Sequence, residues 1–341
     1  AALALLDLDA ATPGLDRDAA GTPTGVLRAA ANSAAFTAFW RIFAVQVGLQ
    51  RAFAAAAQEA ARHGVTTLHA LDDLENVQAL LACQDQLAVR VVPYTQCKDV
   101  AAVRALGLRQ IGGCGQVMVD GDFGPHTAAL LEPYADQPDT CGVLYWQAAD
   151  LDRYVAEAHA GGMQVALHCL GSGAIEQLLD AYERALAAQP RPDHRHRIEH
   201  FQLPAPGQAE RARRLGVALA MQPSFNHYWP HTAGYPQVVG PARAQQLDPI
   251  RSALAAGLEV AFGSDSPVTP MRPLQWLHAA VNHSNPDQRI SVAEALRCCT
   301  LAGARLAFQE GDRGSLRPGK LGDLVLLGAD PHTAAPAAMP F

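Results

Sequence analysis

Three polar residues lie at the ends of short apolar runs in the second half of the chain. They are His168 after MQVAL, His200 within HRIEHFQL, and Asp265 after LEVAFGS. Two imidazoles and a carboxylate form a common ligand set for a divalent metal such as Zn²⁺ or Fe²⁺. A carboxylate left unpaired at the end of an apolar strand is costly, so Asp265 needs a metal or a protonated histidine as partner. These residues predict a metal centre, provided that the fold brings them together.

The runs that carry these residues belong to a repeating pattern, in which short apolar runs alternate with longer, alanine-rich amphipathic stretches. This alternation is typical of repeated βα units. Parallel strands joined by helices place all their carboxyl ends at one face, where the polar residues converge. We expect seven such strands, one fewer than a closed eight-stranded barrel, at residues 65–71, 87–94, 116–121, 163–171, 196–203, 216–224 and 258–267.

Helices and domain limits follow from the same pattern. The amphipathic stretches predict helices at 41–62, 73–88, 149–160 and 292–307. The apolar run DLVLLGAD at 323–330 predicts a small β appendage outside the barrel. We therefore divide the chain into an N-terminal arm over 1–35, a TIM-like barrel over 36–310 and a partial β-sandwich appendage over 311–341.

Composition excludes several classes of protein. The 341 residues are 49% hydrophobic and 17% charged, which is globular composition. With Lys+Arg 26 against Asp+Glu 33, the net charge of −7 gives no attraction to nucleic acid or to an anionic membrane. The seven cysteines form no CxxC pair, and the first residues are too short an apolar run for a signal peptide. We expect a cytoplasmic protein with a small-molecule substrate.

Several further blocks occur in a fixed order along nearly the whole chain. Among them are GTPTGVLRAA (21–30), HGVTTLHAL (63–71), VDGDFGPHTAAL (119–130), QVALHCLGSGAI (164–175), GSDSPVTPMRPLQWLHAAV (263–281) and GSLRPGKLGDLVLL (314–327). In these blocks the chain resembles the amidohydrolase superfamily, and within it the YtcJ-like or "amidohydrolase 3" group that includes N-substituted formamide deformylases.

The resemblance implies a fold and a reaction. The fold is α/β, a distorted TIM (β/α)8-type barrel, here without its first strand and with a small β appendage. The reaction is attack of a metal-activated water on a non-peptide C–N bond. His168 and His200 would be metal ligands, and Asp265 a metal ligand and the general base that passes a proton to the leaving amine.

The chain also departs from the family pattern. No His-x-His pair precedes the GTPTG block, and the literal HxH at His194–His196 is interpreted as part of a solvated loop. Gln116 stands where the family has a metal-bridging carboxylated lysine, and Ser172 replaces an acidic residue. These departures predict one ion, Zn²⁺, rather than two, with a water in its fourth position.

Other polar and aromatic residues are predicted to line the mouth of the barrel. Gln116 and His69 follow or end predicted strands, and His126 and Trp229 lie in long loops that would overhang the site. Loops at this face of a barrel set specificity, so we expect these four residues to contact the substrate. Cys97 is interpreted as a buried thiol.

The sequence thus predicts a metal-dependent amidohydrolase-like protein that cleaves an amide bond of a small molecule. Two alternatives stay open. One is a degenerate, metal-poor barrel homologue that acts as a binding or scaffold protein. The other is a truncated version of a normal amidohydrolase. A barrel that lacks a strand has open edges, which favours a homo-oligomer.

Overall fold

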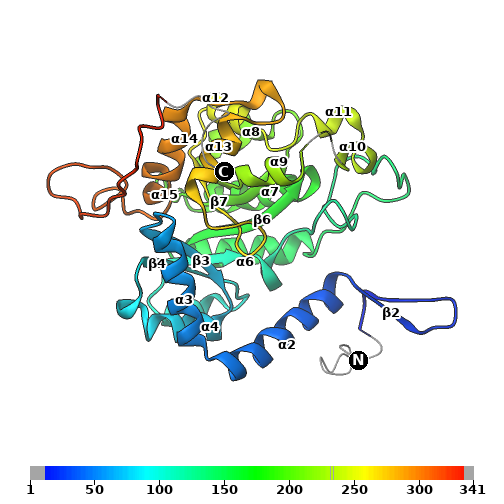
Figure 1. The fold of residues 1–341 in the computed structure, drawn as a ribbon. Coiled ribbons are helices and arrows are strands. Elements are labelled where there is room, and N and C mark those ends of the chain that lie inside the picture. The colour runs from blue at the N-terminus through cyan, green and yellow to red at the C-terminus, as the bar shows by residue number, and fades with distance from the viewer. Residues whose placement is uncertain (1–11, 231, 233, 334–341) are drawn as a thin grey trace.

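A single curled sheet of parallel strands organises the chain (Figure 1). The computed structural model describes residues 12–230, 232 and 234–333. The strands follow each other in chain order: β3 (Thr67–Asp72), β4 (Arg90–Thr95), β5 (Gln110–Gly113), β6 (Gln164–Gly171), β7 (Arg197–Leu203), β8 (Ala218–Met221) and β9 (Val260–Phe262). Within the described residues β3 and β9 form the two edges of this sheet. The predicted α/β class and seven parallel strands are confirmed, as an open half-barrel.

The third strand lies elsewhere than the sequence pattern indicates. We predicted it at 116–121, but the structure places β5 at Gln110–Gly113 and a 3-10 turn, η2, at Gly115–Val117. The run QIGG has two glycines and no alternation, so its strand signal is weak. It is fully buried beside β6, and this packing decides its conformation. The segment predicted as a strand instead crosses the end of β6, where the Val119 N–H donates to the His168 carbonyl at 3.0 Å.

Gly112 permits the close approach of β5 to β6. It pairs with Ala166 in the parallel register and has φ +117°. A Cβ atom at this position would lie 1.8 Å from the Ala166 carbonyl oxygen. Only glycine tolerates both the backbone angle and the contact, so this residue fixes the distance between the two strands.

The four predicted helical stretches are helical in the structure, but three of them are each divided into two elements. The predicted helix 41–62 is divided at Gly48 into α2 (Ala29–Val47) and α3 (Leu49–Arg62). The prediction 149–160 agrees with α6 (Ala148–Ala160). The stretch 73–88 forms α4 (Leu74–Leu81) and η1 (Gln84–Gln86), and 292–307 forms α14 (Val292–Cys299) and α15 (Leu301–Leu306). The others are α5 (Val100–Ala105), α7 (Ser172–Ala188), α8 (Gln208–Leu215), α9 (Pro223–Tyr228), α10 (Tyr235–Val238), α11 (Pro241–Ala244), α12 (Ile250–Ala255), α13 (Pro273–Val281) and η3 (Pro286–Gln288).

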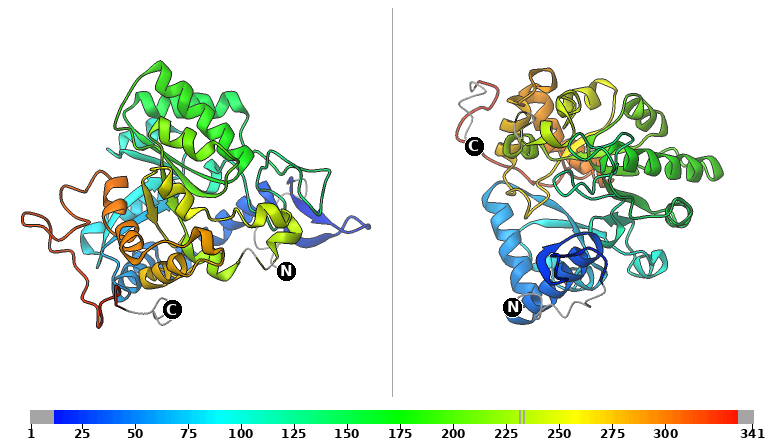
Figure 2. Two further views of the ribbon diagram at one scale, coloured as in Figure 1. Left: turned by 90° about the horizontal axis from the view of Figure 1, so that it is seen from above. Right: turned by 90° about the vertical axis from the view of Figure 1, so that its right-hand side faces the viewer.

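The two ends of the described chain lie outside the sheet. At the N-terminal end, an antiparallel hairpin of β1 (Leu15–Arg17) and β2 (Pro23–Leu27) leads into α2, which stands apart from the sheet in Figures 1 and 2. At the C-terminal end the predicted β appendage is wrong, because residues 323–330 form no strand in the described structure. The segment is held by an ion pair between Arg90 Nε and Asp323 Oδ2 at 2.9 Å rather than by strand pairing.

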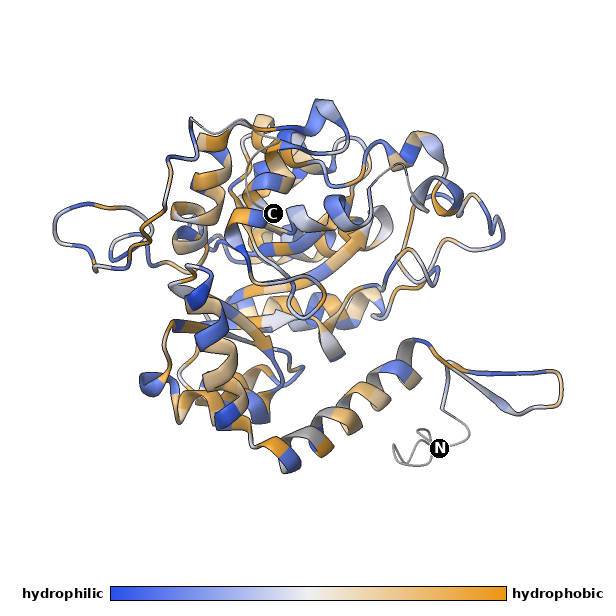
Figure 3. Ribbon diagram, in the orientation of Figure 1, coloured by the Kyte–Doolittle hydropathy of each residue, from blue (hydrophilic) through white to orange (hydrophobic). Residues whose placement is uncertain are grey.

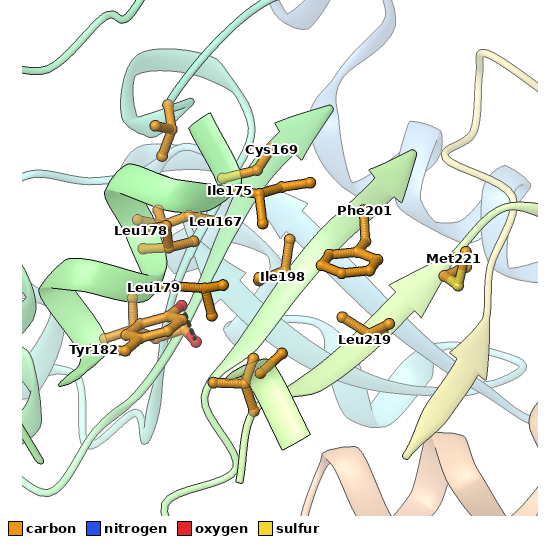
Figure 4. Packing of buried hydrophobic residues seen from close by; sticks show 14 of the residues in the cluster. Leu167, Cys169, Ile175, Leu178, Leu179, Tyr182, Ile198, Phe201, Leu219 and Met221 are labelled. Carbon is orange, nitrogen blue, oxygen red and sulfur yellow. Dashed lines mark hydrogen bonds between the residues drawn. The ribbon is translucent and has the colours of Figure 1, made fainter. Parts of the chain in front are cut away.

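The main core lies between the sheet and its surrounding helices. The helices carry polar and apolar residues side by side (Figure 3), and their apolar faces pack on the strands. Figure 4 shows the packing of α7 against β6 and β7, with Ile175, Leu178 and Tyr182 in contact with the strand residues. This packing makes β6 and β7 a rigid base for the residues at their ends. Among the described residues, no helix has both the length and the apolar character needed to span a membrane.

Candidate metal centre

A large cavity opens at the carboxyl ends of the parallel strands. Its volume is about 3490 Å³, and it is lined by residues from the strand ends, from α3 and from the C-terminal segment. His168, His200 and Asp265 all line it. The three predicted residues thus face one cavity, but only His168 and His200 belong to a group of closely spaced donor atoms.

Three side chains in this cavity offer donor atoms close together. They are Cys114, just after β5, His168 on β6 and His200 on β7, and their donor atoms all lie within 4.8 Å of one another. Cys114 Sγ is 3.9 Å from His168 Nδ1, and the two imidazole centroids are 4.5 Å apart. Ligands of one tetrahedral zinc ion are separated by about 3.3 to 3.6 Å, given bonds of about 2.0 Å to nitrogen and 2.3 Å to sulfur. The donor atoms of Cys114, His168 and His200 are thus nearly as close together as the ligands of a bound zinc ion.

The hydrogen bonds of the two histidines direct a lone pair from each into this group. His200 Nδ1 lies 2.8 Å from Gln222 Oε1, an acceptor, so Nδ1 carries the proton. Its Nε2 is buried and has no hydrogen-bond partner among the described residues. His168 Nε2 lies 3.2 Å from the Gly121 carbonyl oxygen, which leaves Nδ1 unprotonated and facing Cys114. Such carbonyl contacts orient the histidine ligands of protein metal sites, so the donor set fits a divalent metal.

Burial keeps both imidazoles in the form that binds metals. It lowers the pKa of His200 to about 4, and burial together with the neighbouring His200 lowers the pKa of His168 well below its ordinary value. Both rings are neutral at physiological pH, and a neutral imidazole is the metal ligand.

Asp120, whose role the sequence did not indicate, supports this arrangement. Its buried carboxylate accepts the backbone N–H groups of Ala129, Leu170 and Gly171, each at 2.9 Å. These bonds fasten the loop after η2 to the end of β6, and one carboxylate oxygen lies 3.7 Å from His168 Nε2. Burial raises the pKa of Asp120 to about 7. The DG pair at Asp120–Gly121 ends the run that the pattern predicts as the strand 116–121, and this prediction gives Asp120 no role of its own.

Asp265 faces the same cavity from the loop after β9. Its carboxylate lies outside the group within 4.8 Å, and burial together with the nearby Asp122 raises its pKa to about 7. Asp265 and His200 both have left-handed backbone angles, φ 55° and 74°. Such angles cost about 1 kcal/mol or more in a non-glycine residue and concentrate at functional sites. A carboxylate with a pKa near neutrality is suited to proton transfer.

Two of the predicted substrate contacts line the cavity at its polar side. Gln116 is exposed there, and its Nε2 donates to the Gln96 carbonyl oxygen at 2.9 Å. His69, on β3, lies 3.0 Å from Arg197 Nη1, and burial lowers its pKa to about 3. A neutral His69 therefore accepts from the arginine through Nδ1.

The two loop residues are placed differently from each other. Trp229 lines the cavity and is 42% exposed. It packs edge-on against Phe225, which in turn stacks on His200 at 5.8 Å between ring centroids. His126 is not among the residues that line the described cavity, and its Nε2 pairs with Asp136 at 2.9 Å. Trp229 therefore lies at the predicted site, whereas His126 lies in a neighbouring loop and does not line the cavity.

The prediction that the HxH segment forms a solvated loop is wrong, because His194 and His196 are buried. His196 Nδ1 accepts the Val165 N–H at 3.0 Å, so its Nε2–H donates to His159 Nδ1 at 2.8 Å. His159 then donates from Nε2 to the Gln189 carbonyl oxygen at 2.7 Å. His194 accepts the His196 N–H and donates to the Leu215 carbonyl oxygen. All the ring nitrogens are used, so this segment is structural.

We expect these three imidazoles to resist protonation more than an ordinary histidine does, because burial lowers their pKa and each Nδ1 accepts a hydrogen bond. Burial lowers the pKa of His159, His194 and His196 below the ordinary value. A histidine with an ordinary pKa is roughly nine-tenths protonated at pH 5.5. Nitrogen NMR at pH 5.5 should show a smaller protonated fraction than this for each of the three, with the neutral form as the Nε2–H tautomer, and a protonated fraction of nine-tenths would contradict the hydrogen-bond chain. Because their folded pKa values lie below the unfolded ones, they stabilise the fold above about pH 6.5 and lose that contribution as pH falls.

Known proteins resemble this chain in sequence and in fold. Putative amidohydrolase YtcJ of Bacillus subtilis is 31% identical over 240 residues, which cover 67% of this chain and 44% of that protein. N-substituted formamide deformylase of Arthrobacter pascens is 29% identical over 241 residues, covering 66% of this chain and 42% of that protein. The chain thus spans less than half the length of these curated relatives.

A solved structure and a family model extend the comparison to almost the whole chain. An uncharacterized metal-dependent hydrolase from Pyrococcus horikoshii OT3 superposes with a TM-score of 0.80 at 26% identity, covering 99% of this chain and 70% of that one. The model of the Amidohydrolase family matches residues 1–340. With its strand-end histidines at the mouth of a parallel α/β sheet, the chain belongs to the Amidohydrolase family.

Proposed function

We propose that this site hydrolyses a non-peptide amide bond with the help of a divalent metal held by His168 and His200. The observation that carries the proposal is the convergence of two neutral imidazole lone pairs, His168 Nδ1 and the unpartnered His200 Nε2, in a cavity that also contains Asp265. A buried ring nitrogen without a partner, as His200 Nε2 is among the described residues, is costly, and a metal ion would accept the lone pairs of both rings.

The chemistry divides between the ion and the side chains. A bound divalent metal supplies Lewis acidity and lowers the pKa of water toward neutrality. Asp265 accepts a proton from the attacking water and returns it to the nitrogen of the leaving amine, so the proton count balances. Gln222 holds the His200 ring in its ligand orientation. Phe225 and Trp229 form an aromatic wall beside it, suited to an apolar substituent on the amide.

The finer assignments follow the same reasoning. We propose one Zn²⁺ ion and a small N-acyl or N-formyl amide as substrate, the latter supported by the name of the Arthrobacter relative. Gln116 and His69, which line the cavity, are proposed to contact the substrate. All seven cysteines are free thiols, which supports a cytoplasmic location. Among the described residues β3 and β9 have no outer neighbour in the sheet, which supports a homo-oligomer.

Metal content tests the proposal directly. Wild-type chain purified with zinc and then desalted is expected to retain about one equivalent, because both imidazole lone pairs face one position. The double variant His168→Ala/His200→Ala should retain almost none, because it lacks both imidazoles. His332→Ala, which removes an exposed histidine far along the chain, is the matched control and should bind as wild type does. Zinc retention by the double variant would overturn the site.

One observation favours a second function. Gln116 is exposed, and its amide is engaged with the backbone of Gln96, so it offers no anion for a second ion. A metal-poor homologue that only binds a ligand would have such a residue. Wild-type chain that retains no zinc in the experiment above would favour this binding or scaffold role.

A further inference from the structure

We infer that Cys114 is a third protein ligand, whose thiolate completes the metal site of His168 and His200. The inference rests on the proposed function. It assigns to Cys114 the anionic ligand that the neutral amide of Gln116 does not provide. Neither the strand-end pattern nor the departure at Gln116 pointed to this cysteine.

The position of Cys114 follows from the end of β5. The strand ends at Gly113, and Cys114 is the next residue, partly buried in the wall of the cavity. Gly115, with φ 59°, turns the chain away, and a Cβ there would lie 2.3 Å from Gln96 Oε1. This tight turn fixes the Cys114 backbone beside the ends of β6 and β7. Its Sγ then lies 3.9 Å from His168 Nδ1.

A thiol–imidazole hydrogen bond is the competing explanation of this contact. It would satisfy His168 Nδ1 alone and leave His200 Nε2 buried without a partner among the described residues. A shared metal accounts for all three donors, which lie within 4.8 Å of one another. His200 Nε2 is the independent observation, because its side chain is almost completely buried and directed into the group.

The ligand set also predicts which metals bind. One thiolate and two imidazoles favour Zn²⁺ or Co²⁺ over Mg²⁺, Ca²⁺ and Mn²⁺, which prefer oxygen ligands. The negative charge of the thiolate also offsets one positive charge of the ion in a largely buried site. The carboxylated lysine, at whose position Gln116 stands in this chain, would do the same. Three protein ligands leave a fourth position open for water, as in catalytic zinc sites.

Cobalt spectroscopy of the full chain tests the inference without reference to activity. Wild-type protein loaded with Co²⁺ is expected to show visible bands of a four-coordinate ion and a near-ultraviolet sulfur-to-cobalt charge-transfer band. Cys114→Ser should lose the charge-transfer band and weaken Zn²⁺ affinity at least about tenfold in a chelator competition. Cys97→Ser is the matched control, because Cys97 Sγ accepts the Asp99 N–H and a serine hydroxyl replaces it there.

The outcomes separate the two proposals. Visible cobalt bands without a charge-transfer band in the wild type would overturn Cys114 ligation and leave the histidine site standing. No cobalt or zinc uptake by the wild type would overturn the proposed function and this inference together. The wild-type spectrum decides between these outcomes even if Cys114→Ser does not fold, and circular dichroism reports whether it does.

Discussion

Asp265→Asn is expected to lower kcat for amide hydrolysis by about 10²- to 10⁴-fold, the usual contribution of a general base. Asparagine has nearly the shape of aspartate, but its amide cannot accept a proton at neutral pH. Bound zinc should stay at the wild-type level, because the Asp265 carboxylate lies outside the group of donors within 4.8 Å. The measurement is amine release from a panel of N-formyl and N-acyl amides, alongside metal analysis.

A second carboxylate of the cavity provides the control. Asp73 also lines the cavity, at the start of α4, and does not belong to the group of donors within 4.8 Å. Asp73→Asn is expected to keep the wild-type kcat. If Asp265→Asn hydrolysed the amides at the wild-type rate, Asp265 would not be the base. If zinc were lost together with activity, Asp265 would be a ligand in addition.

Gly112→Ala is expected to lower the free energy of unfolding by at least about 3 kcal/mol, through overpacking and backbone strain together. The added methyl group would lie 1.8 Å from the Ala166 carbonyl oxygen, so β5 must move away from β6. Since neither strand can shift without disturbing its own helices, the relaxation is incomplete. Urea denaturation monitored by circular dichroism gives the free energy.

Gly107→Ala is the control that separates the two causes of the expected loss of stability, the steric contact and the backbone angle. Gly107 also has a positive φ, +73°, but a Cβ there would meet no atom within 4 Å. Its replacement should cost only about 1 kcal/mol, the penalty of a left-handed alanine. Equal losses in the two variants would show that the contact between β5 and β6 is not tight. A larger loss at Gly112, with reduced zinc content, would link the strand spacing to the position of Cys114.

The hydrophobic pattern was sufficient for the class of fold and for much of the site. Alternation of apolar runs with amphipathic stretches is local, so it located six of the seven parallel strands and placed His168, His200 and Asp265 at one face. It was wrong for β5, where QIGG has no pattern of its own, and for residues 323–330, where an apolar run forms no strand. It was wrong also for His194 and His196, whose polar surroundings in sequence suggested solvent although both are buried.

The sequence by itself determined that β6 and β7 carry the imidazoles His168 and His200 and that Asp265 follows β9, because that information lies within each βα unit. Only the tertiary structure decided which donors meet. Cys114 lies 54 residues from His168 in sequence, and its thiol reaches that ring because β5 pairs with β6 in one register and the glycines allow close contact. The tautomers of His168 and His200 likewise depend on Gly121 and Gln222 from other segments. Distances and proton positions are set by packing between distant segments, which a local pattern does not contain.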